Sequence, residues 1–400
     1  MKAADCDVLI AGGGPVGLCL GYLLARKGVT VRVLEAEEAI AKDLRASTFH
    51  PPTLDMLAEF GVAGELMTRG LVCPSWQVRL HPSGERAVFE LKTLADVTAH
   101  PFRLQCEQWK LSEALEMRLK REKTATLEFG ARLEGFEQDS SGVTARVSRG
   151  GTTETLYAKF LVGADGARGL VRKLLGLEFD GQTYPETTLL VTTTFPFEEH
   201  LEGLSNVSYC WKAGGNFSLL KVPGRWRVSI YPREGQSIEE QLSEDSVEAS
   251  LQEIVPRKAR YTVLEKRDYR VHQRIVPRYF KDRVALAGDA AHLNSPAGGM
   301  GLNGGIHDAF ELAAALHEIL GGADQRARLD LYDRRRRPVA REQILEQADR
   351  NRARMREKDP EKRREILAGL QAIAADPARS RAYLLKSSMI EGLRIAAAIG

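Results

Sequence analysis

The sequence has few cysteines and no arrangement of them that would build a framework. Its 400 residues include five, Cys6, Cys19, Cys73, Cys106 and Cys210, and no two of them form a C-x-x-C pair. An odd and scattered set fits neither a disulfide scaffold nor a zinc site. We therefore expect a reducing, cytoplasmic location and no metal centre.

Long apolar runs and an excess of one charge are also lacking. No stretch of about 18 apolar residues occurs, so no membrane span is expected. The short apolar run from Val8 to Ala11 leads directly into glycines, which is typical of a strand and not of a signal peptide. The 57 basic and 54 acidic residues leave a formal net charge of +3. This balance gives no reason to expect a nucleic-acid partner.

The first 35 residues contain a strand, a helix and a second strand. Asp7 to Ala11 predicts a buried strand, and leucines at helical spacing follow it. Gly28 ends the helix, and Val31 to Leu34 predicts the next strand. Such a βαβ unit implies a parallel sheet with a right-handed crossover.

A glycine-rich loop, Gly12-x-Gly14-x-x-Gly17, contains Pro15 and joins the first strand to the helix. The first glycine allows a tight turn, the second lets a pyrophosphate approach the backbone, and the third lets the helix pack on the strand. Glu35 ends the second strand, where an acid can bind an adenosine ribose. The pattern predicts a dinucleotide site but does not distinguish FAD from NAD.

Later segments interrupt this unit with β structure. Trp76 to Glu90 predicts an antiparallel hairpin, and Thr187 to Tyr231 predicts a second block of strands. From Ile306 onward the sequence is mostly helical. The predicted fold class is α/β, a Rossmann-like dinucleotide-binding domain with an inserted β-rich substrate domain and a helical C-terminal tail. The predicted domains are residues 1–75, 100–186 and 276–340 for nucleotide binding, 76–99 and 187–275 for the β-sheet substrate domain, and 341–400 for the helical segment.

Two further motifs follow predicted strands. One contains Gly163, Asp165 and Gly166; the other contains Gly288 and Asp289 and continues from Pro296 into a glycine-rich turn. An aspartate at the carboxyl end of a strand faces the edge where ligands bind. The glycines after Pro296 open a helix whose N–H groups can stabilise an anion such as a reduced flavin.

Together, the three motifs resemble the single-component FAD-dependent aromatic hydroxylases, flavoprotein monooxygenases similar to para-hydroxybenzoate hydroxylase, over roughly residues 5–340. The resemblance implies that Asp289 binds the ribityl chain and that Asp165 supports FAD, although Asp165 could instead cap the following helix. Gln105 is the alternative to Gln108 as the FAD-binding glutamine. The implied cofactor-binding residues are Gly12, Gly14, Pro15, Gly17, Glu35, Arg45, Gln108, Asp165, Gly166, Gly288, Asp289, Gly299, Gly301, Leu302 and Asn303.

The resemblance also implies an activity. NADPH or NADH, as a transient co-substrate without a domain of its own, would reduce FAD. Reduced FAD and O2 would form a C4a-hydroperoxide that hydroxylates a small aromatic or heteroaromatic substrate. His50 and Pro296 are the catalytic candidates, His50 as an acid–base group and Pro296 through its carbonyl; His50 could instead simply pack before Pro51. Position in the inserted domain predicts a substrate site lined by Tyr209, Trp211, Phe217, Leu219 and Tyr231, with core packing as the alternative for Trp211.

Three other functions fit the same flavin motifs. A flavin-dependent halogenase is disfavoured because Trp226 to Pro232 does not match W-x-W-x-I-P. A quinone-biosynthesis hydroxylase acting on a prenylated phenol draws slight support from the Arg334 to Arg337 cluster. A flavin-binding reductase or sensor without oxygenation would carry the same motifs. The assembly is left open between a monomer and a homodimer.

Overall fold

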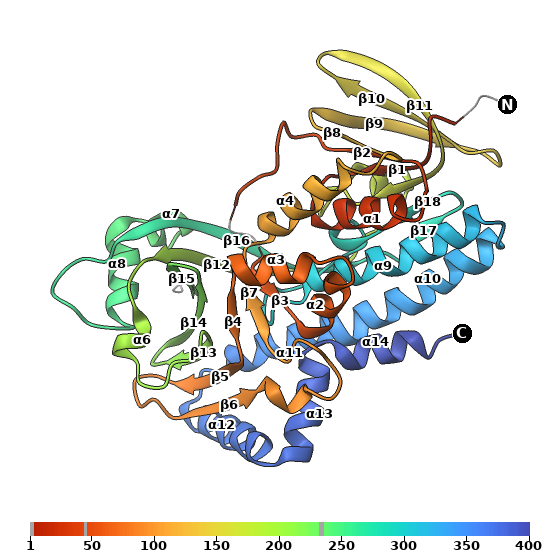
Figure 1. Ribbon diagram of the computed structural model, residues 1–400. Helices are drawn as coiled ribbons and strands as arrows, with labels where there is room; N and C mark the ends of the chain where they lie inside the picture. Colours follow the sequence, from red (N-terminus) through yellow and green to blue (C-terminus); the bar gives the residue numbers. More distant parts are fainter. Residues whose placement is uncertain (1–3, 44–45, 232–235) are drawn as a thin grey trace.

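Two large sheets, joined by long strands and flanked by helices, make up the computed structural model, which describes residues 4–43, 46–231 and 236–400 (Figure 1). The first sheet has the order β17-β18-β11-β1-β2-β8, and β1 pairs in parallel with both β2 and β11. The antiparallel strands β9 and β10 extend it beside β11. Its strands are β1 (Cys6–Ala11), β2 (Val31–Leu34), β8 (Ala125–Glu128), β9 (Ala131–Gln138), β10 (Val143–Arg149), β11 (Thr152–Gly163), β17 (Phe280–Lys281) and β18 (Val284–Leu286).

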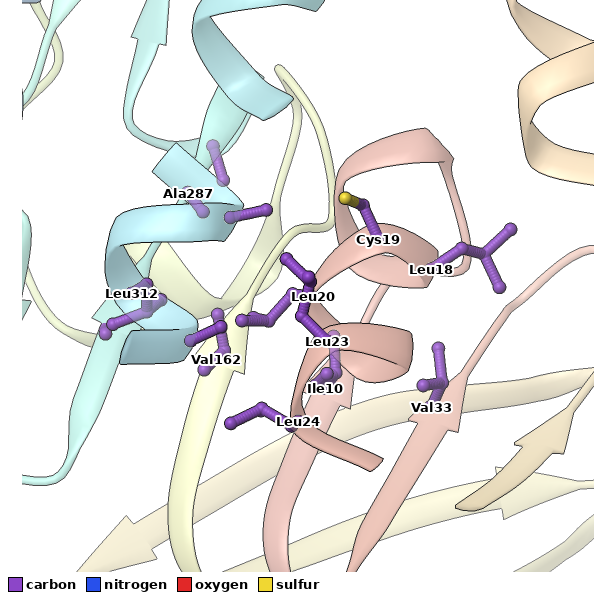
Figure 2. Close-up of a cluster of buried hydrophobic side chains, with 14 of the residues drawn as sticks. Ile10, Leu18, Cys19, Leu20, Leu23, Leu24, Val33, Val162, Ala287 and Leu312 are labelled. Atoms are coloured by element: carbon purple, nitrogen blue, oxygen red, sulfur yellow. The ribbon is translucent and has the colours of Figure 1, made fainter. Parts of the chain in front are cut away.

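Helix α1 (Pro15–Ala25) packs on this sheet beside helix α9 (Gly301–Leu320), and Figure 2 shows Leu312 of α9 next to Val162 of β11. Apolar side chains lie around most of the surface of α1, which is typical of a helix that is covered on several sides. Leu20 and Leu24 are fully buried, each contributing about 1.5–3 kcal/mol by leaving water. A Cβ on Gly21 would lie 2.9 Å from Val33 Cγ2, so the helix approaches β2 closely.

The second sheet has the order β19-β16-β12-β15-β14-β13-β5-β6. The predicted hairpin is present, and β5 joins the sheet by pairing in parallel with β13. The predicted boundary between residues 186 and 187 falls inside β12, which pairs with β16 on both sides of a register shift between Thr183 and Thr187. The strands are β5 (Ser75–Leu80), β6 (Arg86–Glu90), β12 (Asp180–Thr193), β13 (Val207–Lys212), β14 (Gly215–Val222), β15 (Arg225–Ile230), β16 (Val263–Ile275) and β19 (His292–Leu293).

The two faces of the second sheet have different surroundings. Its outer face packs against α8 (Glu244–Gln252), with α6 (Phe197–His200) and α7 (Ile238–Gln241) nearby (Figure 1). Its inner face, defined here by Thr192, Tyr209, Trp211 and Arg227, looks toward the rest of the molecule. Side chains alternate between the faces along each strand, so the register of β13, β14 and β15 fixes which residues point inward.

Smaller elements connect the two sheets. A three-stranded sheet of order β3-β7-β4 lies between them, next to helices α2, α3 and α4. These elements are β3 (Thr48–Phe49), α2 (Pro51–Ala58), α3 (Val62–Arg69), β4 (Leu71–Cys73), η1 (Leu91–Leu94), β7 (Arg103–Gln105), α4 (Gln108–Leu119), α5 (Leu170–Leu174) and η2 (Gly288–Ala290).

The C-terminal segment is helical, as predicted, and it folds back over the second sheet (Figure 1). Tyr383 stacks on Phe89 at 4.7 Å and on Trp76 at 6.0 Å between ring centroids. Arg381 binds Asp96 through both guanidinium nitrogens at 2.6 Å. Among the described residues, no helix is long and apolar enough to cross a membrane. The helices are α10 (Gln325–Val339), the π-helical turn η3 (Ala340–Leu345), α11 (Glu346–Met355), α12 (Pro360–Ala375), α13 (Pro377–Ser387) and α14 (Ile390–Ala397).

Candidate active site

The glycine loop is tightly packed at two of its glycines and open at the third. Gly12 has φ +109°, and a Cβ there would lie 2.3 Å from the Ala164 carbonyl oxygen. A Cβ on Gly17 would lie 1.9 Å from the Gly12 carbonyl oxygen. At Gly14 a Cβ would meet nothing within 4 Å. The loop therefore leaves room at the start of α1, where backbone N–H groups and Pro15 at the first turn suit a pyrophosphate.

Glu35 and Asp289 lie beside this opening. Glu35 Oε2 accepts a hydrogen bond from the Gly13 N–H at 2.8 Å, and Oε1 accepts one from Glu37 at 2.9 Å. Asp289 is exposed, and its neighbour Gly288 is close enough to α1 that a Cβ would lie 3.0 Å from Val16 Cγ2. Glu35 and the turn that carries Asp289 therefore lie near opposite ends of the loop, and their binding of FAD hydroxyl groups stays a prediction.

Asp165 caps the helix that follows it, which is the alternative role predicted from its position. Its Oδ2 accepts the Val171 N–H at 3.0 Å, so the carboxylate caps the start of α5. Burial raises the pKa of Asp165, and its hydrogen bonds to the backbone oppose this only in part. Gly169 is required by this arrangement, because a Cβ there would lie 2.3 Å from Asp165 Oδ1. Asp165 and Gly166 thus shape the turn, and direct contact of Asp165 with FAD stays a prediction.

Gln108 is the first residue of α4, as predicted, and its N–H donates to the Ala46 carbonyl at 2.9 Å. Gln105 is fully buried in β7, where its amide exchanges hydrogen bonds with the hydroxyls of Ser47 and Thr48. The side chain of Gln105 is therefore used inside the protein, which favours Gln108 as the cofactor-binding glutamine. Arg45 lies outside the described residues.

The side chain of Asn303 holds the loop from Pro296 to Asn303 in place by hydrogen bonds. Its Nδ2 donates to the carbonyls of Thr48 at 2.8 Å and Gly299 at 2.7 Å, and its Oδ1 accepts the His50 N–H at 2.9 Å. The Pro296 carbonyl accepts the Gly299 N–H at 3.0 Å. The Asn303 side chain is thus used to position the loop, and contact of Gly301 and Leu302 with FAD stays a prediction.

The geometry favours the packing role of His50, and its role as an acid–base group stays a prediction. Its ring is fully buried, and Nε2 lies 2.8 Å from the Gly298 carbonyl, to which it donates. Burial lowers the pKa of His50 to about 3, and the nearby Arg103 adds to this effect. The imidazole therefore stays neutral at ordinary pH and holds the loop with one hydrogen bond.

His50→Gln should keep most of the activity, because the glutamine amide can replace the Nε2 donor, whereas His50→Ala should destabilise the fold by about 1–3 kcal/mol. The shape of the pH profile of kcat/KM should be the same in the wild type and in His50→Gln. Urea unfolding and pH profiles of both variants test this. An acid–base role would instead make the two substitutions equally harmful to the rate and would remove one limb of the profile.

The predicted substrate residues divide between the two sheet faces. Tyr209 and Trp211 lie on the inner face. Trp211 is fully buried in a hydrophobic cluster and donates from Nε1 to the Arg354 carbonyl at 3.3 Å, which favours core packing for it. Tyr231 also faces inward, near Arg352 and Arg356, and burial raises its pKa. Phe217 and Leu219 point the other way, into the outer core beside α8, and so cannot line a site shared with Tyr209.

Arg227 and helix α11 both contribute to the inner face, and neither was predicted from the sequence to do so. Arg227 alternates with the core residues Trp226 and Val228, a period-2 signal that could have assigned it to the inner face. Helix α11 comes from the C-terminal segment: a Cβ on Gly298 would lie 3.1 Å from Asn351 Nδ2. Tyr184 donates to Asp349 Oδ1 at 2.6 Å. No local pattern indicates contacts between positions so far apart in the chain.

A buried ion-pair network supports the cofactor side of the site. Asp308 accepts from Arg336 Nε at 2.7 Å, from His292 Nε2 at 2.8 Å and from the Gly288 N–H at 3.1 Å. Burial alone would raise the pKa of Asp308, but His292 and Arg336 outweigh it and lower the pKa to about 2. His292 is therefore a packed residue of this network, which fixes the turn that carries Asp289.

The parallel sheet, the open glycine loop and the second sheet beside it are the architecture of an FAD-binding flavoprotein. The family model described as "FAD binding domain" matches residues 5–348. The chain belongs to this family, and within it to the FAD-dependent aromatic hydroxylases, the flavoprotein monooxygenases similar to para-hydroxybenzoate hydroxylase. FAD is therefore its cofactor.

Individual relatives agree with this assignment. Para-nitrophenol 4-monooxygenase from Pseudomonas sp. (strain WBC-3) is 34% identical, with 99% of this chain and 98% of that one covered. The crystal structure of p-nitrophenol 4-monooxygenase PnpA from Pseudomonas putida superimposes with a TM-score of 0.90 at 31% identity, covering 98% and 99% of the two chains. 6-hydroxy-3-succinoylpyridine 3-monooxygenase from Pseudomonas putida is 32% identical, with 82% of this chain and 84% of that one covered.

Proposed function

We propose that this protein hydroxylates a small phenol of the para-nitrophenol type at the carbon that bears the para substituent, with O2 and NADPH or NADH as co-substrates. The observation that carries this proposal is the match to a para-nitrophenol 4-monooxygenase over 99% of this chain. That match includes the C-terminal segment, whose helix α11 adjoins the inner face through Trp211 and Tyr184. The hydroxypyridine-acting relative matches only 82% of the chain.

The chain's own residues would bind and enclose the reactants. When bound, FAD would take two electrons from the nicotinamide and activate O2 for transfer of one oxygen atom to the ring. The N–H groups at the start of α9 would stabilise negative charge on the reduced cofactor, because a helix N-terminus favours anions. Tyr209, Trp211 and Tyr231, on the inner face, would hold the ring and exclude water.

The products expected from para-nitrophenol give a direct test. Para-nitrophenol, O2, NADPH and H+ would yield benzoquinone, nitrous acid, NADP+ and water, because a hydroxyl placed on the nitro-bearing carbon displaces the nitro group as nitrite. Purified holoprotein should therefore release one nitrite per substrate consumed, and 18O2 should label the quinone product. The same assay with NADH identifies the preferred nicotinamide.

A panel of other substrates separates the remaining functions. A hydroxypyridine converted in place of para-nitrophenol would move the substrate class toward that of the pyridine-acting relative. A prenylated phenol converted in its place would favour quinone biosynthesis. If nicotinamide is oxidised but none of the ring compounds gains oxygen, the oxygenase proposal is wrong, and the protein acts as a reductase or sensor.

A further inference from the structure

Arg103 is a buried arginine whose guanidinium lacks hydrogen-bond partners. It begins strand β7, stands opposite Cys73 in the pairing with β4, and is 2% exposed. Its Nε and Nη1 have no hydrogen-bond partner among the described residues, and no carboxylate of that part of the chain pairs with it. Burying N–H donors in this way is costly, because each gives up its hydrogen bonds to water. An acceptor from a ligand would offset the cost.

A second donor without a partner lies next to this guanidinium. The Arg103 Cζ lies over the Trp76 ring, 5.0 Å from its centroid. The Trp76 Nε1 is also buried and has no hydrogen-bond partner within the described residues. The contact with the ring face stabilises the cation in part but satisfies none of these N–H groups. Two neighbouring side chains therefore supply donors for the same acceptor.

The two donors lie beside the inner face and near the glycine-rich loop that follows Pro296. The Trp76 ring meets the Tyr209 ring edge to face at 6.2 Å between centroids, and Tyr209 lies on the inner face. The positive charge of Arg103 adds to the lowering of the pKa of His50, whose Nε2 donates to a carbonyl of that loop. Arg103 therefore lies between the second sheet and the loop.

The proposed function identifies the part of the substrate that would reach this place. The ring carbon that receives oxygen bears the nitro group, so the nitro group must lie on the cofactor side of the ring. A nitro group has two acceptor oxygens and no proton to donate. A guanidinium presents N–H groups in a fork that matches two such oxygens, and an indole N–H is a donor only.

We propose that Arg103 and Trp76 bind the nitro group of the substrate and thereby hold the nitro-bearing carbon toward the cofactor. The inference rests on the proposed function and assigns the residues that recognise the displaced group. Orientation of this kind decides which ring carbon is attacked, because oxygen transfer requires the reacting atoms to be held close together.

Three probes test the assignment on the holoprotein. Para-nitrophenol has a nitro group and a hydroxyl, 4-nitroanisole has the nitro group without the hydroxyl, and 4-chlorophenol has the hydroxyl without the nitro group. Their Kd values are measured from the change in the flavin spectrum for the wild type, Arg103→Gln, Arg103→Lys and Trp76→Phe. Arg79→Gln is the matched control, because Arg79 is 3% exposed but stands opposite Cys210, on the other face of the sheet from Tyr209.

Arg103→Gln should weaken binding of both nitro compounds by about 10- to 100-fold and leave binding of 4-chlorophenol within about threefold. Arg103→Lys should recover only part of the affinity, because an ammonium group lacks the fork of donors. Trp76→Phe keeps a ring beside the guanidinium and removes the N–H, so it should weaken binding of the nitro compounds by about 2- to 10-fold. Arg79→Gln should match the wild type for all three probes.

Two patterns of loss would overturn the proposal. Equal losses for all three probes in Arg103→Gln would mean that the arginine supports packing only. Losses confined to the two phenols would mean that it binds the hydroxyl end of the ring. If Arg103→Gln does not fold, as judged by bound FAD and urea unfolding, Trp76→Phe decides, and unchanged binding of the nitro compounds in that variant overturns the proposal.

Nitrite release separates this inference from the proposed function. With para-nitrophenol, Arg103→Gln should release less nitrite per nicotinamide oxidised than the wild type, because the ring is no longer held in the reactive orientation. If the wild type releases nitrite and Arg103→Gln changes neither this ratio nor any Kd, the inference is wrong and the proposed function survives. If the wild type releases no nitrite, the proposed function is wrong, and binding of 4-nitroanisole, which needs no turnover, still decides whether Arg103 binds a nitro group.

Discussion

Gly14→Ala should cost the protein most of its FAD while leaving the polypeptide folded. Gly14 has φ −72° and ψ −179°, which alanine adopts freely, and a Cβ there would meet no protein atom within 4 Å. The new methyl group would instead occupy the space into which the pyrophosphate must fit. Overpacking of this kind costs about 1–3 kcal/mol, which corresponds to a Kd for FAD about 5- to 150-fold weaker. Titration of the apoprotein with FAD measures the change.

Gly17→Ala is the matched substitution for Gly14→Ala. A Cβ on Gly17 would lie 1.9 Å from the Gly12 carbonyl oxygen, so this variant should lose stability even without FAD. Urea unfolding of the two apoproteins separates the effects, because only Gly17→Ala should unfold earlier. If Gly14→Ala binds FAD with wild-type affinity, the pyrophosphate does not pass over Gly14, and the assignment of the cradle is wrong.

The motifs predicted where the cofactor site lies better than they predicted what each side chain does there. Strand, glycine loop and helix follow from short-range patterns, and the parallel sheet formed as expected. The side chains of Asn303 and Asp165, however, bind backbone groups of the protein, which spacing alone does not distinguish from binding a cofactor. A polar side chain in a tight loop often forms hydrogen bonds with the backbone of that loop, because buried backbone groups need hydrogen-bond partners.

The substrate side was harder to predict for two physical reasons. Alternation defines two faces within one strand but not the register between neighbouring strands, and the register of β13 and β14 places Phe217 opposite Cys210, on the other face from Tyr209. Contacts such as the hydrogen bond from Tyr184 to Asp349 join positions 165 apart in the chain. Such pairs depend on how the C-terminal helices dock, and docking is decided by the whole packed core.

Asp308→Asn should destabilise the protein by about 3–5 kcal/mol, since it leaves the Arg336 guanidinium buried without its carboxylate. Asparagine keeps the shape and can still accept from the Gly288 N–H, so the charge is the main change. Urea unfolding at a fixed excess of FAD measures the loss. Asp330→Asn is the control: its carboxylate is 35% exposed and pairs with Arg326 at 2.9 Å and with Arg278, and the loss of these exposed pairs should cost less than about 1 kcal/mol.

The pH dependence of stability and a double variant test whether loss of the Asp308–Arg336 ion pair causes the destabilisation of Asp308→Asn. The folded pKa of Asp308 is depressed to about 2, so its contribution is present above the ordinary aspartate range near pH 4 and is lost as the pH falls toward 2. The stability difference between the wild type and Asp308→Asn should therefore shrink over this interval. Adding Arg336→Met to Asp308→Asn should restore part of the stability, because it removes the unpaired charge. A difference that is independent of pH, with no restoration in the double variant, would mean that the loss comes from packing around Gly288 and His292 and not from the buried charges.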